Sequence, residues 1–180
     1  MMSTKVLYVA GVPASGKSTL FKLVRQKLFA GATTFKEGKV RGIENGHYKM
    51  LGVFDGSLFE GTDRLSMSVI DDAISYIKRL SSDTDRHVVF VEGDRLFNIR
   101  FMRETRAVLL LIDADGSVLR ARHIARGDTQ SGRFLKSRRS KVENFARKYG
   151  VKRVFNNTED EQQCILDYII KIATEYVGGK

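Results

Sequence analysis

The chain has 180 residues, of which 42% are hydrophobic and 29% are charged, as expected of one globular domain spanning residues 1–180. No apolar run is long enough to span a membrane, and a single cysteine excludes an internal disulfide, which favours a reducing, cytoplasmic location. The net charge is +10, and the whole excess lies in residues 117–153, where twelve Lys or Arg face two acids, Asp128 and Glu143.

The first elements surround a glycine-rich loop. Residues 5–10 are apolar and predict a buried strand, with no secretory signal before them. Residues 11–18, GVPASGKS, then fit the phosphate-binding pattern G-x-x-x-x-G-K-[ST], and apolar residues at helical spacing follow. In such a loop backbone N–H groups wrap a phosphate, Lys17 adds a catalytic charge and the Ser18 hydroxyl holds Mg²⁺. The residues predicted to bind the nucleotide are Gly11, Ala14, Ser15, Gly16, Lys17, Ser18 and Thr19.

A β-hairpin is predicted after the glycine-spaced stretch at residues 31–38. Extended segments at residues 39–43 and 47–53 flank an Asn-Gly pair, which is a strong hairpin signal. Asp55 follows the second segment and is a candidate general base, because a carboxylate at a strand end could accept a proton from an acceptor hydroxyl. A simple turn residue is the alternative, since Asp-Gly is common in turns.

A loop at residues 57–64 leads into a predicted helix from Leu65 to about residue 81. Arg64 could make a bidentate contact with an acceptor phosphate, and Asp63 could orient Arg64 or bind a base. The alternative for this pair is a helix cap beside a solvated charge.

Two further buried strands are predicted at residues 87–91 and 107–112, and each ends in an acid. An ionised carboxylate at a buried strand end is costly without a cation or hydrogen bonds, so Glu92 is a candidate partner for Mg²⁺ or its water shell. Asp113 competes for that role but is more typical of a structural residue. Asp94 could bind substrate or cap a short helix that carries apolar residues from 96 to 101.

The basic segment predicts two helices joined by a loop at residues 127–132. Arginines on a closing lid, here about residues 122–140, can neutralise a transferred phosphoryl group and exclude water. Arg122 and Arg126 are the catalytic candidates, and Arg133, Arg138 and Arg139 are candidates for substrate binding. A solvated basic face is the alternative. The three histidines have no metal-ligand spacing, so no zinc site is proposed.

A last strand is predicted at residues 151–155, before a capping box at residues 158–161 and a final helix. That helix is predicted to bury Tyr168 and to carry Cys164 on its apolar face. Strands alternating with helices predict an α/β fold whose parallel sheet is covered on both faces. Ligands bind such sheets at the carboxyl ends of the strands, where the glycine loop and most of the candidate acids fall.

The chain resembles the P-loop kinases related to adenylate and shikimate kinases. The resemblance lies in the glycine loop, an acid after the second strand, the lid pattern Arg122-x-x-x-Arg126 and the loop after the last strand. The resemblance implies a three-layer fold with a mainly parallel five-stranded sheet, a β-hairpin insertion and an Arg-rich lid. It also implies ATP at residues 11–18, with Asn156 and Asn157 beside the adenine. One departure is that the third strand ends in Glu92-Gly93-Asp94 rather than in the usual Walker-B aspartate.

The segment at residues 59–69, FEGTDRLSMSV, resembles bacteriophage P-loop kinases associated with hypermodified thymine bases. That group includes 5-hydroxymethyluridine DNA kinases, which phosphorylate the base hydroxymethyl group within DNA. The resemblance implies an ATP- and Mg²⁺-dependent kinase of DNA with a modified thymine, and an acceptor site near Asp55 and Asp63–Arg64. A kinase of a free nucleotide or other small molecule and a DNA-binding P-loop ATPase without a phosphate acceptor are the alternatives. The localised basic segment favours a polyanionic partner, and nothing in the sequence indicates an oligomeric state.

Overall fold

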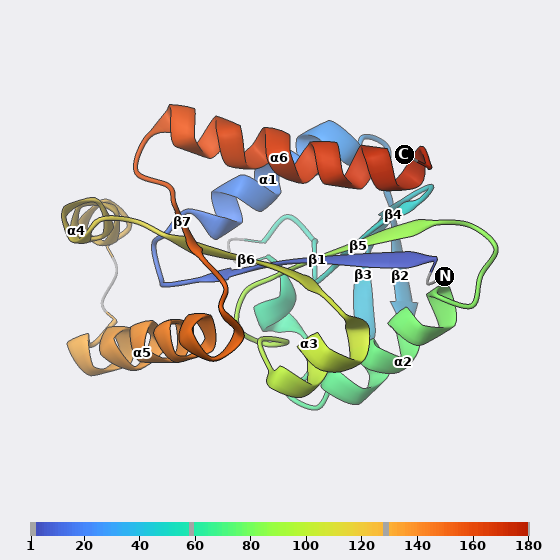
Figure 1. Cartoon of the computed structure of the whole chain (residues 1–180), viewed down its shortest axis with the longest axis horizontal. Coiled ribbons are helices and arrows are strands. Elements are labelled where there is room, and N and C mark those ends of the chain that lie inside the picture. Colours follow the sequence, from blue (N-terminus) through green and yellow to red (C-terminus); the bar gives the residue numbers. More distant parts are fainter. Residues whose placement is uncertain (1–2, 58–59, 128–129, 180) are drawn as a thin grey trace.

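The computed structural model describes residues 3–57, 60–127 and 130–179 and contains one seven-stranded sheet in the order β2-β3-β4-β5-β1-β6-β7 (Figure 1). The strands are β1 (Thr4–Gly11), β2 (Thr33–Glu37), β3 (Val40–Asn45), β4 (Tyr48–Leu51), β5 (His87–Glu92), β6 (Val108–Asp113) and β7 (Arg153–Phe155). The helices are α1 (Lys17–Leu28), the short 3₁₀ helix η1 (Thr62–Arg64), α2 (Ile70–Leu80), α3 (Ile99–Thr105), α4 (Gly116–Ala125), α5 (Gly132–Tyr149) and α6 (Glu159–Val177).

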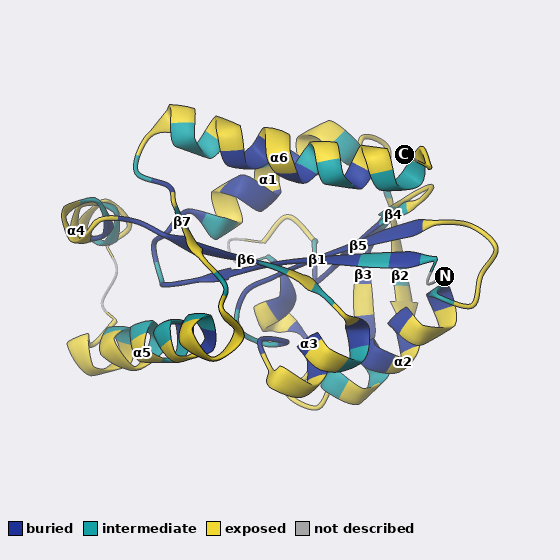
Figure 2. Ribbon diagram, in the orientation of Figure 1, coloured by how far each residue is buried: buried dark blue, intermediate teal, exposed yellow. Residues whose placement is uncertain are grey.

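Helices cover both faces of the sheet. α1 and α6 lie on one face, and α2, α3 and α5 lie on the other (Figure 1). The central strand β1 sends alternate side chains to each side: Leu7 and Val9 pack with α1 and α6, whereas Val6 and Tyr8 pack with the opposite layer. The buried colouring therefore runs along β1, β5 and β6 without the alternation of a solvent-facing sheet (Figure 2). The predicted α/β fold with a mostly parallel sheet is confirmed.

The predicted number of five strands is wrong. β4, β5, β1, β6 and β7 run parallel to one another, and β2 and β3 add an antiparallel edge. The predicted hairpin forms as β3 and β4, but it belongs to the main sheet because β4 also pairs with β5. β2 was not predicted because only Phe35 among its residues is partly buried, stacking on Tyr76 with 5.3 Å between ring centroids.

Two helix predictions also need correction. The helix expected from Leu65 starts only at Ile70, because the preceding serines form a turn in which Ser66 Oγ accepts from the Ser68 backbone. In α6 the buried stripe is Ile165, Leu166, Ile169 and Ala173. Cys164 and Tyr168, which were expected in the core, are exposed, since the apolar stripe is rotated away from them.

The structure does not show a lid. Residues 122–140 lie at the end of α4 and in the first half of α5, and residues 128 and 129 of the predicted loop lie outside the described residues. Residues 58 and 59 of the segment that carries the closer resemblance also lie outside them. Within the part of the chain that the structure describes, no helix has the length and apolar character needed to cross a membrane.

The buried hydroxyl of Tyr8 ties the central strand to the turn after β5. Tyr8 is 0% exposed, and its Oη donates to the carbonyl oxygen of Gly93 at 2.9 Å. Tyr8→Phe should lower the free energy of unfolding by about 1–3 kcal/mol, because the Gly93 carbonyl loses its buried donor. Tyr168→Phe, at an exposed position on α6, is the matched control, and its free energy of unfolding should stay within about 0.5 kcal/mol of the parent value. Urea unfolding measures both, and equal losses in the two variants would contradict this role of Tyr8.

Candidate active site

The phosphate loop joins the end of β1 to the start of α1. Gly11 packs so closely on β6 that a Cβ atom there would lie 1.9 Å from the carbonyl oxygen of Ile112. Gly16 has a φ of 91°, in the left-handed region that glycine adopts without strain. Lys17 Nζ donates to the carbonyl oxygens of Gly11 at 3.1 Å and Val12 at 2.8 Å. Strand, loop and helix therefore follow one another in the order that the sequence predicts.

A cavity of about 300 Å³, which we call the phosphate cavity, opens beside this loop. The predicted site residues in its lining are Gly11, Ala14, Lys17, Ser18, Asp63, Arg64, Glu92, Asp94 and Arg126. Pro13, Glu60, Gly93, Gln130 and Phe134 also line it. Segments from β1 to α5 thus bring a lysine, arginines, a hydroxyl and four carboxylates to one cavity at the carboxyl edge of the sheet.

Glu92 is the buried carboxyl of this cavity. It ends β5 and is 8% exposed, and burial raises its pKa to about 7, with Asp63 and Asp94 adding to the rise and Lys17 opposing it. Burial in turn lowers the pKa of Lys17, against the charges of these carboxylates. Gly61 has a φ of 108°, which glycine adopts without strain, and a Cβ atom there would lie 2.7 Å from Glu92 Oε1, so a larger residue would force the Glu92 carboxyl to shift.

Asp63 and Asp94 are tied to their surroundings by hydrogen bonds and ion pairs. Asp63 Oδ1 accepts from the backbone N–H groups of Asp94 and Arg95, both at 3.2 Å, and so fixes the turn after β5. Asp94 forms ion pairs with Arg138 at 3.2 Å and with Lys141 at 3.8 Å. These pairs connect α5 directly to the phosphate cavity.

Asp55 lies apart from the phosphate cavity. It is exposed and forms a 2.6 Å ion pair with Arg64, whose hydrogen bond lowers the pKa of the Asp55 carboxyl. Arg64 also donates to Ser57 Oγ at 2.6 Å, so it holds the loop that follows β4. Among the described residues, Asp55 lines a separate cavity with Arg41 and is not in the lining beside Lys17. Its role as general base stays a prediction.

The predicted lid arginines have different surroundings. Arg122 Nη1 donates to the carbonyl oxygen of Ala14 in the phosphate loop at 3.3 Å, and Arg126 lines the phosphate cavity. Arg133 is exposed at the start of α5. Arg139 lies 3.5 Å from Asp113 and 3.7 Å from Glu143. The structure therefore brings Arg122 and Arg126 to the loop and holds Arg139 in an ion-pair network.

Asn156 and Asn157 contact the protein itself. Asn156 is fully buried and its Nδ2 donates to the carbonyl oxygen of Ser15 at 2.8 Å, which braces the phosphate loop. Asn157 Oδ1 accepts from the Asp115 backbone at 2.7 Å. Asp113 is 1% exposed and pairs with Arg153 at 2.9 Å, in keeping with a structural role. The predicted contact of both asparagines with adenine, and that of exposed Thr19 with the nucleotide, stay predictions.

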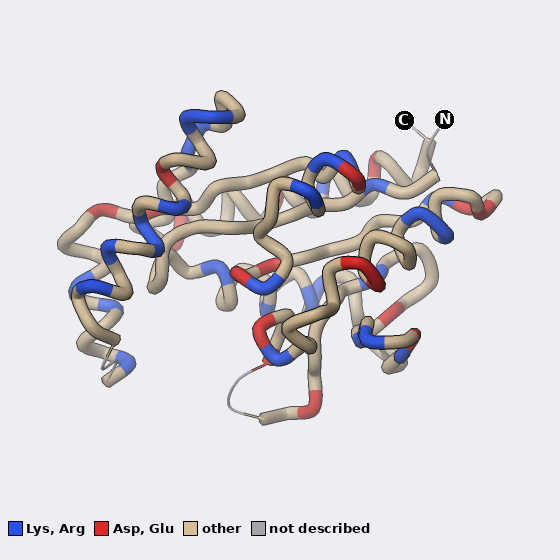
Figure 3. The backbone as a smooth tube through the Cα atoms, turned by 90° about the horizontal axis from the view of Figure 1, so that it is seen from below, with Lys and Arg blue, Asp and Glu red and all other residues tan. Residues whose placement is uncertain are grey.

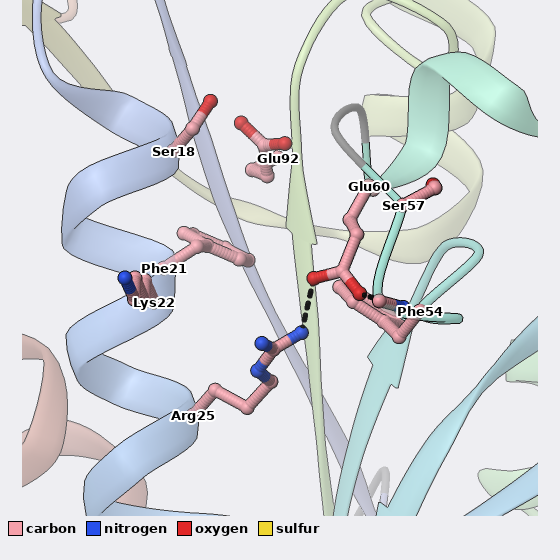
Figure 4. Close-up of a pocket in the computed structure, with 10 residues that line it drawn as sticks. Ser18, Phe21, Lys22, Arg25, Phe54, Ser57, Glu60 and Glu92 are labelled. Carbon is pink, nitrogen blue, oxygen red and sulfur yellow. Dashed lines mark hydrogen bonds and ion pairs between the residues drawn. The ribbon is translucent and has the colours of Figure 1, made fainter.

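A second cavity of about 330 Å³ lies between α1 and the loop after β4 (Figure 4). It shares Ser18, Glu60 and Glu92 with the phosphate cavity. Arg25 Nη1 lies 2.5 Å from Glu60 Oε2, and Glu60 Oε1 accepts from the Gly56 backbone at 2.8 Å (Figure 4). Glu60 therefore joins the loop to α1.

Sequence reasoning did not single out several residues of the site. Tyr8 lies within an apolar strand sequence, which is typical of core, and Phe134 stands at the helical spacing of an apolar face. Arg95 and Gln130 belong to no motif. Glu60 belongs to the segment at residues 59–69, where no separate pattern marks it. Most of these residues lie near a glycine or a strand end in the sequence. Such a position indicates a site residue only when the order of the strands in the sheet is known.

The comparison with protein families agrees with this geometry. The family P-loop Nucleotide Kinase3 matches residues 2–159. The chain belongs to this family. A search of curated proteins finds no match. Family membership indicates a kinase that binds ATP and transfers a phosphoryl group, and kinases of this kind usually use Mg²⁺.

The residues present fit Mg²⁺. No group of three or more His, Cys, Asp or Glu side chains in the described ranges is arranged to hold a metal ion by itself. Mg²⁺ is typically bound by one or two protein oxygens together with substrate phosphates and water, and the Ser18 hydroxyl and Glu92 carboxyl supply such oxygens at the loop.

The burial of Glu92 predicts a pH dependence of stability. Its pKa is about 7 in the folded protein against an ordinary 4.5, so the folded state binds the proton more tightly and stability falls as the pH rises between these values. Glu92→Gln removes this loss. The free energy of unfolding of the variant, relative to that of the parent, should therefore rise by up to about 3 kcal/mol between pH 4.5 and pH 8 in metal-free buffer.

Urea unfolding at the two pH values measures this gain. Glu175→Gln on the exposed side of α6 is the control for removing one negative charge. If the difference in free energy of unfolding between Glu92→Gln and the parent is the same at both pH values, the raised pKa of the buried Glu92 carboxyl is contradicted.

Proposed function

We propose that the protein is a kinase that transfers the γ-phosphoryl group of ATP to the hydroxymethyl group of 5-hydroxymethyluracil in DNA. The main support for kinase chemistry is that one cavity is lined by Lys17, Ser18, Glu92 and Arg126. Phosphoryl transfer requires these parts: a cradle for the phosphates, an oxygen set for the metal and cations over the transferred group. The acceptor is proposed from the resemblance of residues 59–69, which contribute Asp63 and Arg64 to the same cavity.

In this proposal residues 11–19 hold the ATP phosphates, and Lys17 moves from the loop carbonyls to the β- and γ-phosphates. Ser18 and Glu92 hold Mg²⁺, which when bound neutralises charge on the phosphates. The hydroxymethyl oxygen forms a bond to the γ-phosphorus while the bond to the bridging oxygen of ADP breaks. Arg122 and Arg126 neutralise the charge that develops during transfer.

The proton of the hydroxymethyl group goes to a carboxylate. Asp63 lines the phosphate cavity, and only its Oδ1 is engaged by the backbone bonds described above. Asp94 is neutralised by Arg138 and Lys141, and Asp55 is held outside the cavity by Arg64. We therefore propose Asp63 as the proton acceptor, with Asp55 as the alternative that the sequence predicts.

The surface of α5 supports a DNA acceptor. Lys and Arg gather along α4 and α5 at one end of the molecule (Figure 3). Arg138, Arg139 and Lys141 already form ion pairs with carboxylates, whereas Arg133, Lys136, Arg147 and Lys148 are exposed. Exposed cations on one helix can neutralise several DNA phosphates.

A kinase of the free nucleotide is the second candidate. It is favoured by the ion pairs of Arg138, Arg139 and Lys141, because they reduce the number of cations open to a polyanion, and by the family description as a nucleotide kinase. Both candidates share the catalytic residues, so the acceptor must be identified by experiment.

Labelled ATP supplied with DNA containing 5-hydroxymethyluracil, thymine DNA of the same sequence or the hydroxymethyl mononucleotide tests the acceptor. We expect label only on the modified DNA. Replacing the four exposed α5 cations with Ala should raise the KM for DNA at each salt concentration and flatten its salt dependence, with no change in ATP affinity. Label on the mononucleotide alone would establish the second candidate instead, and ATP hydrolysis with no labelled acceptor would indicate an ATPase.

A further inference from the structure

Two apolar side chains face solvent beside the phosphate cavity. Met67, between η1 and α2, is 81% exposed, and Phe134, on the first turn of α5, is 37% exposed. Both line one cavity of about 430 Å³. Large exposed apolar side chains from separate elements that meet at a cavity are typical of a binding surface.

This cavity opens directly onto the site of phosphoryl transfer. It shares Asp63, Asp94 and Phe134 with the phosphate cavity. A flat ring lying against Phe134 would therefore have one edge at Asp63 and Asp94, where a substituent can extend toward the γ-phosphate.

The polar groups around the cavity complement a pyrimidine with two carbonyl groups. Arg138 lies over the Phe134 ring, with 4.9 Å from its guanidinium carbon to the ring centroid. Arg95 contacts Met67 and Asp63, and its buried Nε has no hydrogen-bond partner in the described structure. Both guanidinium groups donate only, so they suit the carbonyl oxygens of a uracil ring.

We propose that Met67 and Phe134 form the walls that hold the hydroxymethyluracil ring, with Arg95 and Arg138 at its carbonyl edge and its hydroxymethyl group directed to Asp63. This inference rests on the proposed function. A base in duplex DNA must leave the stack to enter a cavity of this kind, and stacking on an aromatic side chain is a common way to hold it. The exposed cations of α5 lie on the same helix as Phe134, where the DNA backbone would then pass.

The cavity between α1 and the loop after β4 is the competing location for the ring. Its polar edge is occupied by the 2.5 Å pair of Arg25 and Glu60, and Glu60 also binds the Gly56 backbone. It reaches the phosphate cavity beside Ser18 and Glu92, where we place Mg²⁺, and not beside Asp63. Each cavity thus contains an ion-paired arginine, and the position beside Asp63, the proposed proton acceptor, favours the cavity at Phe134.

Kinetics with wall variants distinguish the two cavities. Phe134→Leu should raise the KM for the modified DNA about 5- to 100-fold, the size of a lost base–aromatic stack, and Met67→Ala should raise this KM too, with ATP affinity within about twofold of the parent for both variants. Phe54→Leu tests the competing cavity, and Ile124→Ala, at an 80% exposed position on α4, controls for loss of an apolar surface group. Both should keep the parent KM. An unchanged KM in Phe134→Leu and Met67→Ala, or a larger rise in Phe54→Leu, would overturn the inference.

A binding measurement keeps this inference separate from the proposed function. The chain has no tryptophan, so Phe134→Trp introduces a single indole into the wall. Its fluorescence should be quenched by single-stranded DNA containing hydroxymethyluracil, and by the mononucleotide if the free nucleotide is the acceptor. Transfer by the parent without quenching would refute the binding cavity alone, whereas quenching without transfer to either acceptor would refute the proposed kinase reaction alone. Absence of both would refute both.

Discussion

The pairing of β1 with β5 is the constraint on which the rest of the site depends. Val9 lies opposite Glu92 in the parallel register, and the Gly93 N–H donates to the Val9 carbonyl at 3.3 Å. The phosphate loop and Glu92 therefore leave the sheet side by side. Because both strands are covered by helices on both faces, the Glu92 carboxyl is buried beside the Lys17 amine, and each changes the pKa of the other.

The basic segment at residues 117–153 supplies the cations that pair with carboxylates at the carboxyl edge of the sheet. Asp94, in the turn after β5, pairs with Arg138 and Lys141, and Asp113, at the end of β6, pairs with Arg139 and Arg153. Part of the positive charge excess of this segment thus neutralises strand-end carboxylates. The remaining exposed cations lie on the same helix, α5, that contributes Phe134 and Arg138 to the proposed acceptor cavity. A long-range positive field from this helix would favour a polyanionic acceptor.

Much of this arrangement could be predicted from the sequence, because its signals are local. The glycine loop, the apolar strand before it and the capping box at Thr158 and Glu161 depend on neighbouring residues, and the structure contains all three. The edge strand β2 has a mostly exposed sequence, so no apolar pattern marks it. The exposed position of Cys164 depends on how α6 is rotated against α1, which helical periodicity alone does not determine.

The separation of Asp55 from Asp63 could not be predicted for a similar reason. Asp55 follows β4 and Asp63 lies in η1, later in the same connection to α2, and their positions in the sequence do not tell which one enters the cavity. Arg64 decides this, since it holds Asp55 outside while Asp63 binds the turn after β5. The same loop contains Glu60, whose contacts with α1 are set by the strand order.

The central claim, that the cavity beside Lys17 is a site of phosphoryl transfer from ATP, is tested most directly by Lys17→Ala. Lys27→Ala, on the exposed side of the same helix, is the matched control. Transfer of label from γ-labelled ATP should be abolished in Lys17→Ala and unchanged in Lys27→Ala, while both variants unfold as cooperatively as the parent. Transfer at the parent rate by a folded Lys17→Ala variant would contradict the account.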